Sequence, residues 1–147
     1  MGPDGSRTKM TIATGIIADE PTANLNIYPR EVLNRAIIQF NHRARKRPVR
    51  GSEIDPLKID NLGDPSFIMH KLLINESGML CADIEILEDT PVGKELLKKI
   101  HKSERVVARP VMCVPAYVDI IKGDKTKIDP LEITDIHSIV RVQVECG

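Results

Sequence analysis

Aromatic side chains are scarce in this sequence of 147 residues, which has no tryptophan, two tyrosines and two phenylalanines. Single-stranded nucleic acids bind largely by stacking their bases on aromatic rings, and this composition provides no such platform. The 21 lysines and arginines balance the 21 aspartates and glutamates, so the formal net charge is zero. A neutral protein is a poor partner for duplex nucleic acid, and we therefore expect no nucleic-acid ligand.

Several other features are also missing. No apolar run reaches the roughly 18 to 20 residues that a membrane span needs, and the first residues lack the pattern of a signal peptide. Cys81, Cys113 and Cys146 are widely spaced, which argues against a disulfide framework or a zinc site and favours reduced thiols. The sequence contains no metal-binding motif and no phosphate-binding glycine loop. We therefore expect a protein with no membrane segment, no metal and no cofactor.

The neutral total hides an uneven distribution of charge. Residues 1–50 carry nine basic and four acidic side chains, whereas residues 51–147 carry twelve and seventeen. The densest basic run contains Arg43, Arg45, Lys46, Arg47 and Arg50. The most acidic stretch contains Asp83, Glu85, Glu88 and Asp89. Both can be solvated surface, but we predict that at least one of them contacts a neighbouring protein, and self-association is electrostatically possible.

Hydrophobic periodicity predicts two helices. The first spans residues 29–43, where Leu33, Ile37 and Phe40 repeat at helical spacing and Asn34 lies on the outer side. The second starts after Thr90, a good capping residue, and ends near residue 101. Its predicted core residues are Val92, Leu96, Leu97 and Ile100.

Strands are predicted elsewhere by alternation and by β-branched residues, over residues 10–18, 67–74, 80–87, 105–114, 116–121 and 133–144. The turn 75–78 joins two of them as a hairpin. Ile68, Leu72 and Ile74 are predicted to share one face, and Val140 is placed on the core face of the last strand. Pro110 removes a backbone donor, so we expect a bulge, an edge or a break there.

The order of these elements predicts an α+β fold. Five to seven strands without βα alternation indicate a mostly antiparallel, barrel-like sheet with about two flanking helices. Nothing marks a domain boundary, so residues 1–147 are interpreted as one domain, with residues 1–9 as a flexible N-terminal arm.

Three segments together resemble a known family. The stretch from Asn26 to Ala36 is similar to an N-x-x-Y-P-x-x-x-L-x-x-A segment of the prohead core proteases of tailed phages, and Gly51 to Pro56 is similar to their G-E-x-x-H-P stretch. Thr90 to Leu96 matches their T-P-x-G-K-x-L helix start. The resemblance covers about residues 10 to 145. It implies an assemblin-like fold and a serine peptidase that matures capsids.

The catalytic positions that this resemblance implies are changed. The histidine base would precede Pro56, where this chain has Asp55, a poor base for a hydroxyl at neutral pH because its ordinary pKa is near 4. The nucleophile would lie in a V-S-S-R-G strand, where this chain has Ala108 and Arg109. Cys113 is the only nucleophile nearby. The resemblance therefore implies a catalytically degenerate relative.

We accordingly expect a non-catalytic structural protein of a phage head, either a capsid decoration or cement subunit or an internal head protein. It would reside in the virion, assemble in the host cytoplasm, and bind the major capsid protein or other head proteins through the basic run. Two alternatives stay open. One is an active maturation peptidase that uses Cys113 or an unrecognised serine, and the other is a small non-viral binding module.

Overall fold

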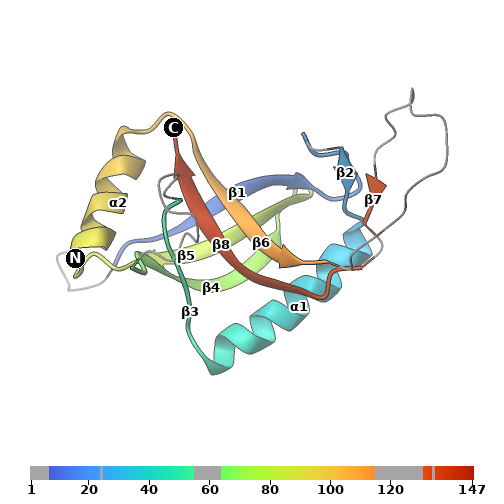
Figure 1. Cartoon of the computed structure of the whole chain (residues 1–147), viewed down its shortest axis with the longest axis horizontal. Coiled ribbons are helices and arrows are strands. Elements are labelled where there is room, and N and C mark those ends of the chain that lie inside the picture. Colours follow the sequence, from blue (N-terminus) through green and yellow to red (C-terminus); the bar gives the residue numbers. More distant parts are fainter. Residues whose placement is uncertain (1–6, 24, 55–63, 115–130, 134) are drawn as a thin grey trace.

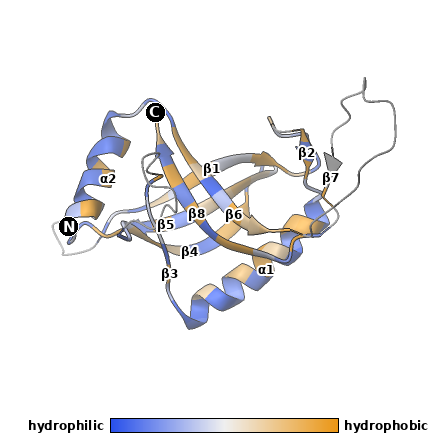
Figure 2. Ribbon diagram, viewed as in Figure 1, coloured by the Kyte–Doolittle hydropathy of each residue, from blue (hydrophilic) through white to orange (hydrophobic). Residues whose placement is uncertain are grey.

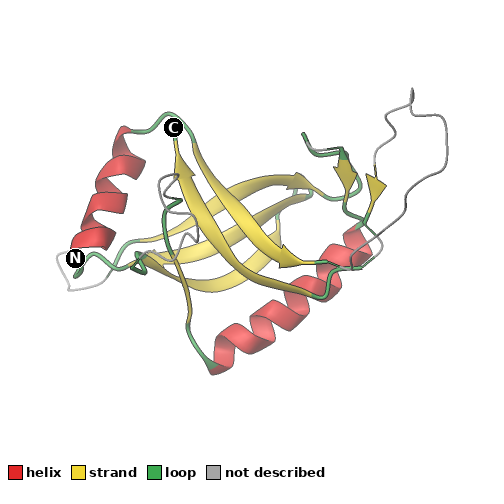
Figure 3. Ribbon diagram, in the orientation of Figure 1, coloured by secondary structure: helices red, strands yellow, loops and turns green. Residues whose placement is uncertain are grey.

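A computed structural model of the chain describes residues 7–23, 25–54, 64–114, 131–133 and 135–147. Figures 1 and 3 show strands that cross one another, with one helix at each side. The helices are α1 (Arg30–Lys46) and α2 (Pro91–Lys102). The strands are β1 (Lys9–Ile17), β2 (Asn26–Ile27), β3 (Val49–Gly51), β4 (Phe67–Ile74), β5 (Met79–Ile86), β6 (Val106–Cys113), β7 (Leu131–Glu132) and β8 (Ser138–Cys146).

The strands form three hydrogen-bonded sheets. The largest has the order β1-β5-β4-β3 and is antiparallel throughout, β6 pairs with β8 antiparallel, and β2 pairs with β7 parallel. After β3 the chain moves over to β8, where the N–H of Ile54 bonds to the carbonyl of Val144 at 2.9 Å. No ladder joins β6 to β1 among the described residues. The predicted α+β class, two helices and mainly antiparallel pairing are confirmed, but the described strands form no closed barrel.

Helix α1 supplies much of the core. Val32, Leu33, Ala36, Ile37 and Phe40 are all buried, which confirms the predicted inner face. Figure 2 shows this helix as hydrophobic along the side that faces the strands and hydrophilic along the other. The helix runs three residues beyond the predicted end at 43. It stops where Arg47 adopts an extended backbone, because Pro48 disfavours a helical residue before it.

Two bulges explain why the predicted strand faces are partly wrong. In β4, Met69 pairs with Ile84 but Lys71 pairs with Asp83, so His70 is an extra residue. Phe67, Met69 and Leu72 therefore face the core, and Ile68 does not share a face with Leu72. A bulge shifts the alternation of side chains by one residue, and a simple period of two misses that shift.

The bulge in β8 acts in the same way. Val111 pairs with Arg141 and Met112 pairs with Ile139, which leaves Val140 as the extra residue. Val140 is only half-buried, whereas Ile139, Val142 and Val144 lie in the core. The last strand begins at Ser138, later than the predicted start at 133. The strand predicted over residues 116–121 lies outside the described residues.

Side chains of α1 bond to the backbone at or next to both bulges. The side-chain amide of Asn41 donates to the carbonyl of Leu72 at 3.0 Å, and its oxygen accepts from the N–H of Leu72 at 2.8 Å. Arg43 donates to the carbonyl oxygens of Ile139 and Val140, and its guanidinium lies 5.3 Å from the centre of the Phe40 ring. These bonds satisfy backbone groups that the irregular ladders leave free.

The start of α2 accounts for the T-P-x-G-K-x-L pattern. The Thr90 hydroxyl accepts from the N–H of Gly93 at 3.0 Å and donates to the carbonyl of Leu87 at 2.8 Å. Gly93 and Leu96 are buried, and Gly93 lies directly against the backbone of Leu87. The prediction for Val92 is wrong, because this side chain is 37% exposed at the first turn of the helix.

Pro110 lies within β6 without interrupting it. Arg105 and Gly147 exchange both backbone hydrogen bonds, so the hydrogen-bonded pairs fall on every second residue from Arg105. Pro110, paired with Val142, falls between them, where an N–H would point away from β8. The missing donor therefore costs no hydrogen bond to β8. In the sheet of β6 and β8, β6 is an edge strand, which is one of the three outcomes expected at Pro110.

Candidate functional site

The segment that precedes Asp55 and the strand that carries Ala108 both contact β8. Asp55 lies outside the described residues, but Ser52 and Ile54 just before it bond to the backbone of Val144 on one side of β8. Ala108 of β6 is the partner of Val144 on the other side. Two strand spacings amount to about 9 to 10 Å, so the fold brings the segment that leads to position 55 near the expected nucleophile positions.

Only one of the two nucleophile positions faces outward. Ala108 is fully buried, so a side chain here points into the core. Arg109 is exposed, and its guanidinium forms a hydrogen-bonded ion pair with Glu145 of β8. The pKa of the Glu145 carboxyl is lowered, chiefly by the hydrogen bond from Arg109. The outward position therefore holds a cation already neutralised by a carboxylate.

The cysteines differ in their surroundings. Burial raises the pKa of the thiols of Cys81 and Cys146, which keeps both protonated and poorly nucleophilic at neutral pH. Cys113 is exposed at the end of β6, and its carbonyl accepts from the N–H of His137 at 2.8 Å. His137 in turn lies 4.0 Å from a carboxylate oxygen of Asp135. Throughout the described parts of the chain, no hydrogen bond joins a thiol or a serine hydroxyl to a histidine ring.

A pocket of about 570 Å³ borders this region. Its walls come from the outer face of β6, from the irregular end of β1 and from the loop that follows. Val107 and Arg109 line it from β6, Arg105 lines it just before this strand, and Tyr28 also lines it. Sequence reasoning did not predict this pocket or the role of Glu145, because both depend on which strands become neighbours.

The basic run is divided by the fold. Arg43 is engaged with the backbone of β8, whereas Arg45, Lys46, Arg47 and Arg50 are exposed. These four make no side-chain hydrogen bond or ion pair within the described residues. They lie at and beyond the C-terminal end of α1, where cations are favourable to the helix dipole.

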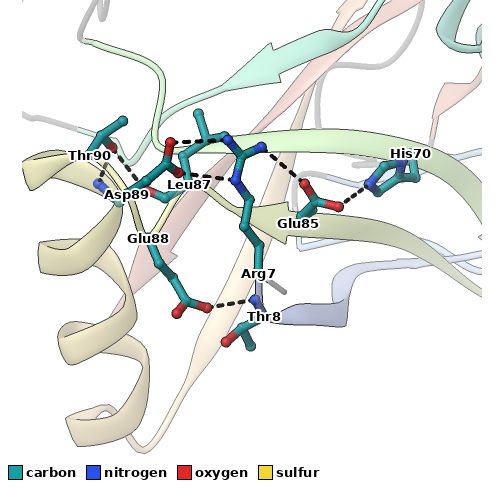
Figure 4. A network of polar contacts seen from close by, with 9 residues as sticks. Arg7, Thr8, His70, Glu85, Leu87, Glu88, Asp89 and Thr90 are labelled. Carbon is teal, nitrogen blue, oxygen red and sulfur yellow. Dashed lines mark hydrogen bonds and ion pairs between the residues drawn. The ribbon is translucent and has the colours of Figure 1, made fainter. Parts of the chain in front are cut away.

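The acidic stretch, by contrast, is engaged within the chain (Figure 4). Arg7 holds both carboxylate oxygens of Asp89 at 3.0 and 3.1 Å and one oxygen of Glu85 at 3.2 Å. His70 contacts the other oxygen of Glu85 at 3.1 Å, and the N–H of Thr8 donates to Glu88 at 2.6 Å. Asp83 accepts from Thr11 and lies 3.8 Å from the Lys71 ammonium. Arg7 and Thr8, near the end of the predicted arm, are thus bound to the domain.

This network predicts a loss of stability in acid. Burial alone would raise the pKa of Glu85, but the hydrogen bonds from His70 and Arg7 outweigh it, and the pKa is lowered; that of Asp89 is lowered chiefly by Arg7. Carboxyls with lowered pKa stabilise the fold above their ordinary pKa values, about 4, and lose this contribution as the pH falls through the lowered values. As the pH is lowered below about 4, we expect the midpoint temperature of thermal unfolding to decrease. The decrease should be smaller in Arg7→Met than in wild type. An equal acid response of Arg7→Met and wild type, measured by circular dichroism at several pH values, would contradict this.

Comparisons with known proteins identify a similar fold but no similar sequence. The sequence matches no protein family model and no curated protein. In three dimensions, however, the chain has the fold of a phage capsid assembly protease. The match is to the solved structure of the bacteriophage T4 capsid assembly protease gp21, with a TM-score of 0.65 and 14% sequence identity, covering 96% of this chain and 82% of that one. The prohead-protease-like fold implied by the sequence resemblance is therefore confirmed. Within the described residues, no helix has the length and apolar character of a membrane span.

Proposed function

We propose that this chain is a non-catalytic structural protein of a tailed-phage head, built on the prohead-protease-like fold. The observation that carries the proposal is the pairing of Arg109 with Glu145 at the outward position where the nucleophile is expected. We assign it to the virion as a decoration, cement or internal head protein that assembles in the host cytoplasm. Its partners would be the major capsid protein or other head proteins.

Two further features support the absence of catalysis. Ala108 offers no nucleophile and is enclosed in the core. Asp55, at the base position, has an ordinary pKa near 4 and would accept a hydroxyl proton poorly. A nucleophile and its base act as one unit, so the loss of both removes most of the rate.

The proposal predicts that the purified protein has no peptidase activity. We expect no self-cleavage and no cleavage of co-expressed head proteins, and no labelling by a fluorophosphonate probe, because no serine is paired with a histidine in the described parts of the fold. The measurement is intact-mass spectrometry after prolonged incubation.

Cys113 defines the alternative, an active peptidase, because it is exposed and its carbonyl accepts a hydrogen bond from the N–H of His137. Cleavage that disappears in Cys113→Ala and persists in Cys81→Ala would support that alternative and overturn the non-catalytic proposal. A second test is location. Stoichiometric amounts of the protein in purified phage particles would support a head protein, whereas its absence from particles would favour a non-viral binding module.

A further inference from the structure

We propose that the exposed face of α1 is a docking surface for an acidic amphipathic helix of a partner protein. This surface, called here the α1 outer face, consists of Asn34, Arg35, Ile38, His42 and Arg45. The inference rests on the proposed function only in assigning the partner to the phage head.

Ile38 is the central feature of the α1 outer face. It is 68% exposed, more than any other large hydrophobic side chain in the described part of the chain. Asn34, Arg35 and His42 lie three or four residues away along the helix, so they surround it, and all are exposed. An apolar centre within a polar rim is the usual composition of a protein interface.

The charges specify an acidic partner. Arg35 and Arg45 on the face make no ion pair or side-chain hydrogen bond within the described residues, and neither do Lys46 and Arg47 beside it. The acidic stretch on the same chain is engaged by Arg7, His70 and other internal partners. A second copy of the chain therefore cannot offer that stretch without breaking its own network. Charge complementarity thus points to a different protein.

A protein fits the surface better than a nucleic acid does. Ile38 would be desolvated against phosphates without finding apolar contacts, and no phenylalanine, tyrosine or tryptophan ring lies on the α1 outer face. A helix with apolar residues at spacings of three and four could cover Ile38 and place carboxylates against Arg35 and Arg45.

The surface is also held rigid before binding. Asn41 and Arg43 bond α1 to the backbone of β4 and β8, and Phe40 anchors it in the core. A rigid surface loses less conformational freedom on association, which favours binding.

The experiment uses a fluorescein-labelled peptide of about 20 residues, long enough to form a helix, with leucine at alternating spacings of three and four and glutamate at most other positions. Fluorescence anisotropy measures its binding to the full chain. A peptide with glutamine in place of glutamate and a DNA duplex of similar charge serve as comparison ligands. We expect the acidic peptide to bind more tightly than either comparison ligand, and its binding to weaken as salt is added.

Ile38→Ala and Arg45→Glu should each weaken binding of the acidic peptide by about tenfold or more, as expected for a central apolar residue and for a reversed charge. Lys98→Glu, at a position on α2 that is also exposed, is the matched control and should change binding by less than about twofold. Equal binding by wild type and Ile38→Ala, or tighter binding of DNA than of peptide, would overturn the proposal. Because the assay requires neither particles nor peptidase activity, its failure is distinguishable from failure of the proposed function.

Discussion

Replacing Phe40 by alanine is expected to lower the free energy of unfolding by about 3 to 5 kcal/mol. Phe40 is 1% exposed and lies in the core between α1 and the strands. Its removal leaves a cavity in addition to the lost burial of the ring, and the surrounding strands can close such a cavity only partly. Urea denaturation followed by circular dichroism measures the change.

Leu33 and Asn34 provide the comparison for this prediction. Leu33 is fully buried, so Leu33→Ala should cost about 2 to 5 kcal/mol, whereas Asn34→Ala on the α1 outer face should change stability by about 0.5 kcal/mol or less. If all three variants were equally mild, α1 would not pack on the core as described here.

Gly93→Ala is expected to destabilise the protein by about 3 kcal/mol, although alanine is normally about 1 kcal/mol better than glycine inside a helix. The reason is steric. A Cβ atom at this position would lie 1.8 Å from the carbonyl oxygen of Leu87 and 3.0 Å from the Thr90 hydroxyl. Either the start of α2 must move away from Leu87 or the cap must break.

The sign of the effect makes this test decisive. Lys94→Ala, at the next and exposed position of α2, should stay within about 0.5 kcal/mol of wild type. A Gly93→Ala variant that is as stable as wild type or more stable would show that the helix start is not in close contact with Leu87. Thermal unfolding of both variants measures the comparison.

The helices could be predicted from the sequence more completely than the strands. The spacing of Leu33, Ile37 and Phe40 directly specifies the buried side of α1, because nothing interrupts its period. In β4 and β8, His70 and Val140 each add one residue and shift the alternation. No local signal marks these residues, since a bulge is determined by the pairing partner as well as by the strand itself.

The candidate site, like the fold, could be predicted from the sequence only in part. The resemblance of short motifs placed Ala108 and Arg109 on one strand and Asp55 directly before Pro56. The structure brings the segment before Asp55 and the strand of Ala108 to opposite sides of β8, as far as the described residues extend. The role of Glu145 and the inward direction of Ala108 required the strand register. The internal pairing of the acidic stretch also required tertiary structure, because Arg7 is distant from it in sequence.

The bonds from α1 to the strands have a consequence for how this domain loses its structure. Asn41 is bonded to β4 and Arg43 to β8, two strands that belong to different sheets. Neither sheet can therefore open at its bulge without releasing α1, and α1 cannot detach without exposing Phe40. Local opening in one sheet is thus linked to opening in the other, so α1 joins the two sheets into a single unit of cooperative unfolding.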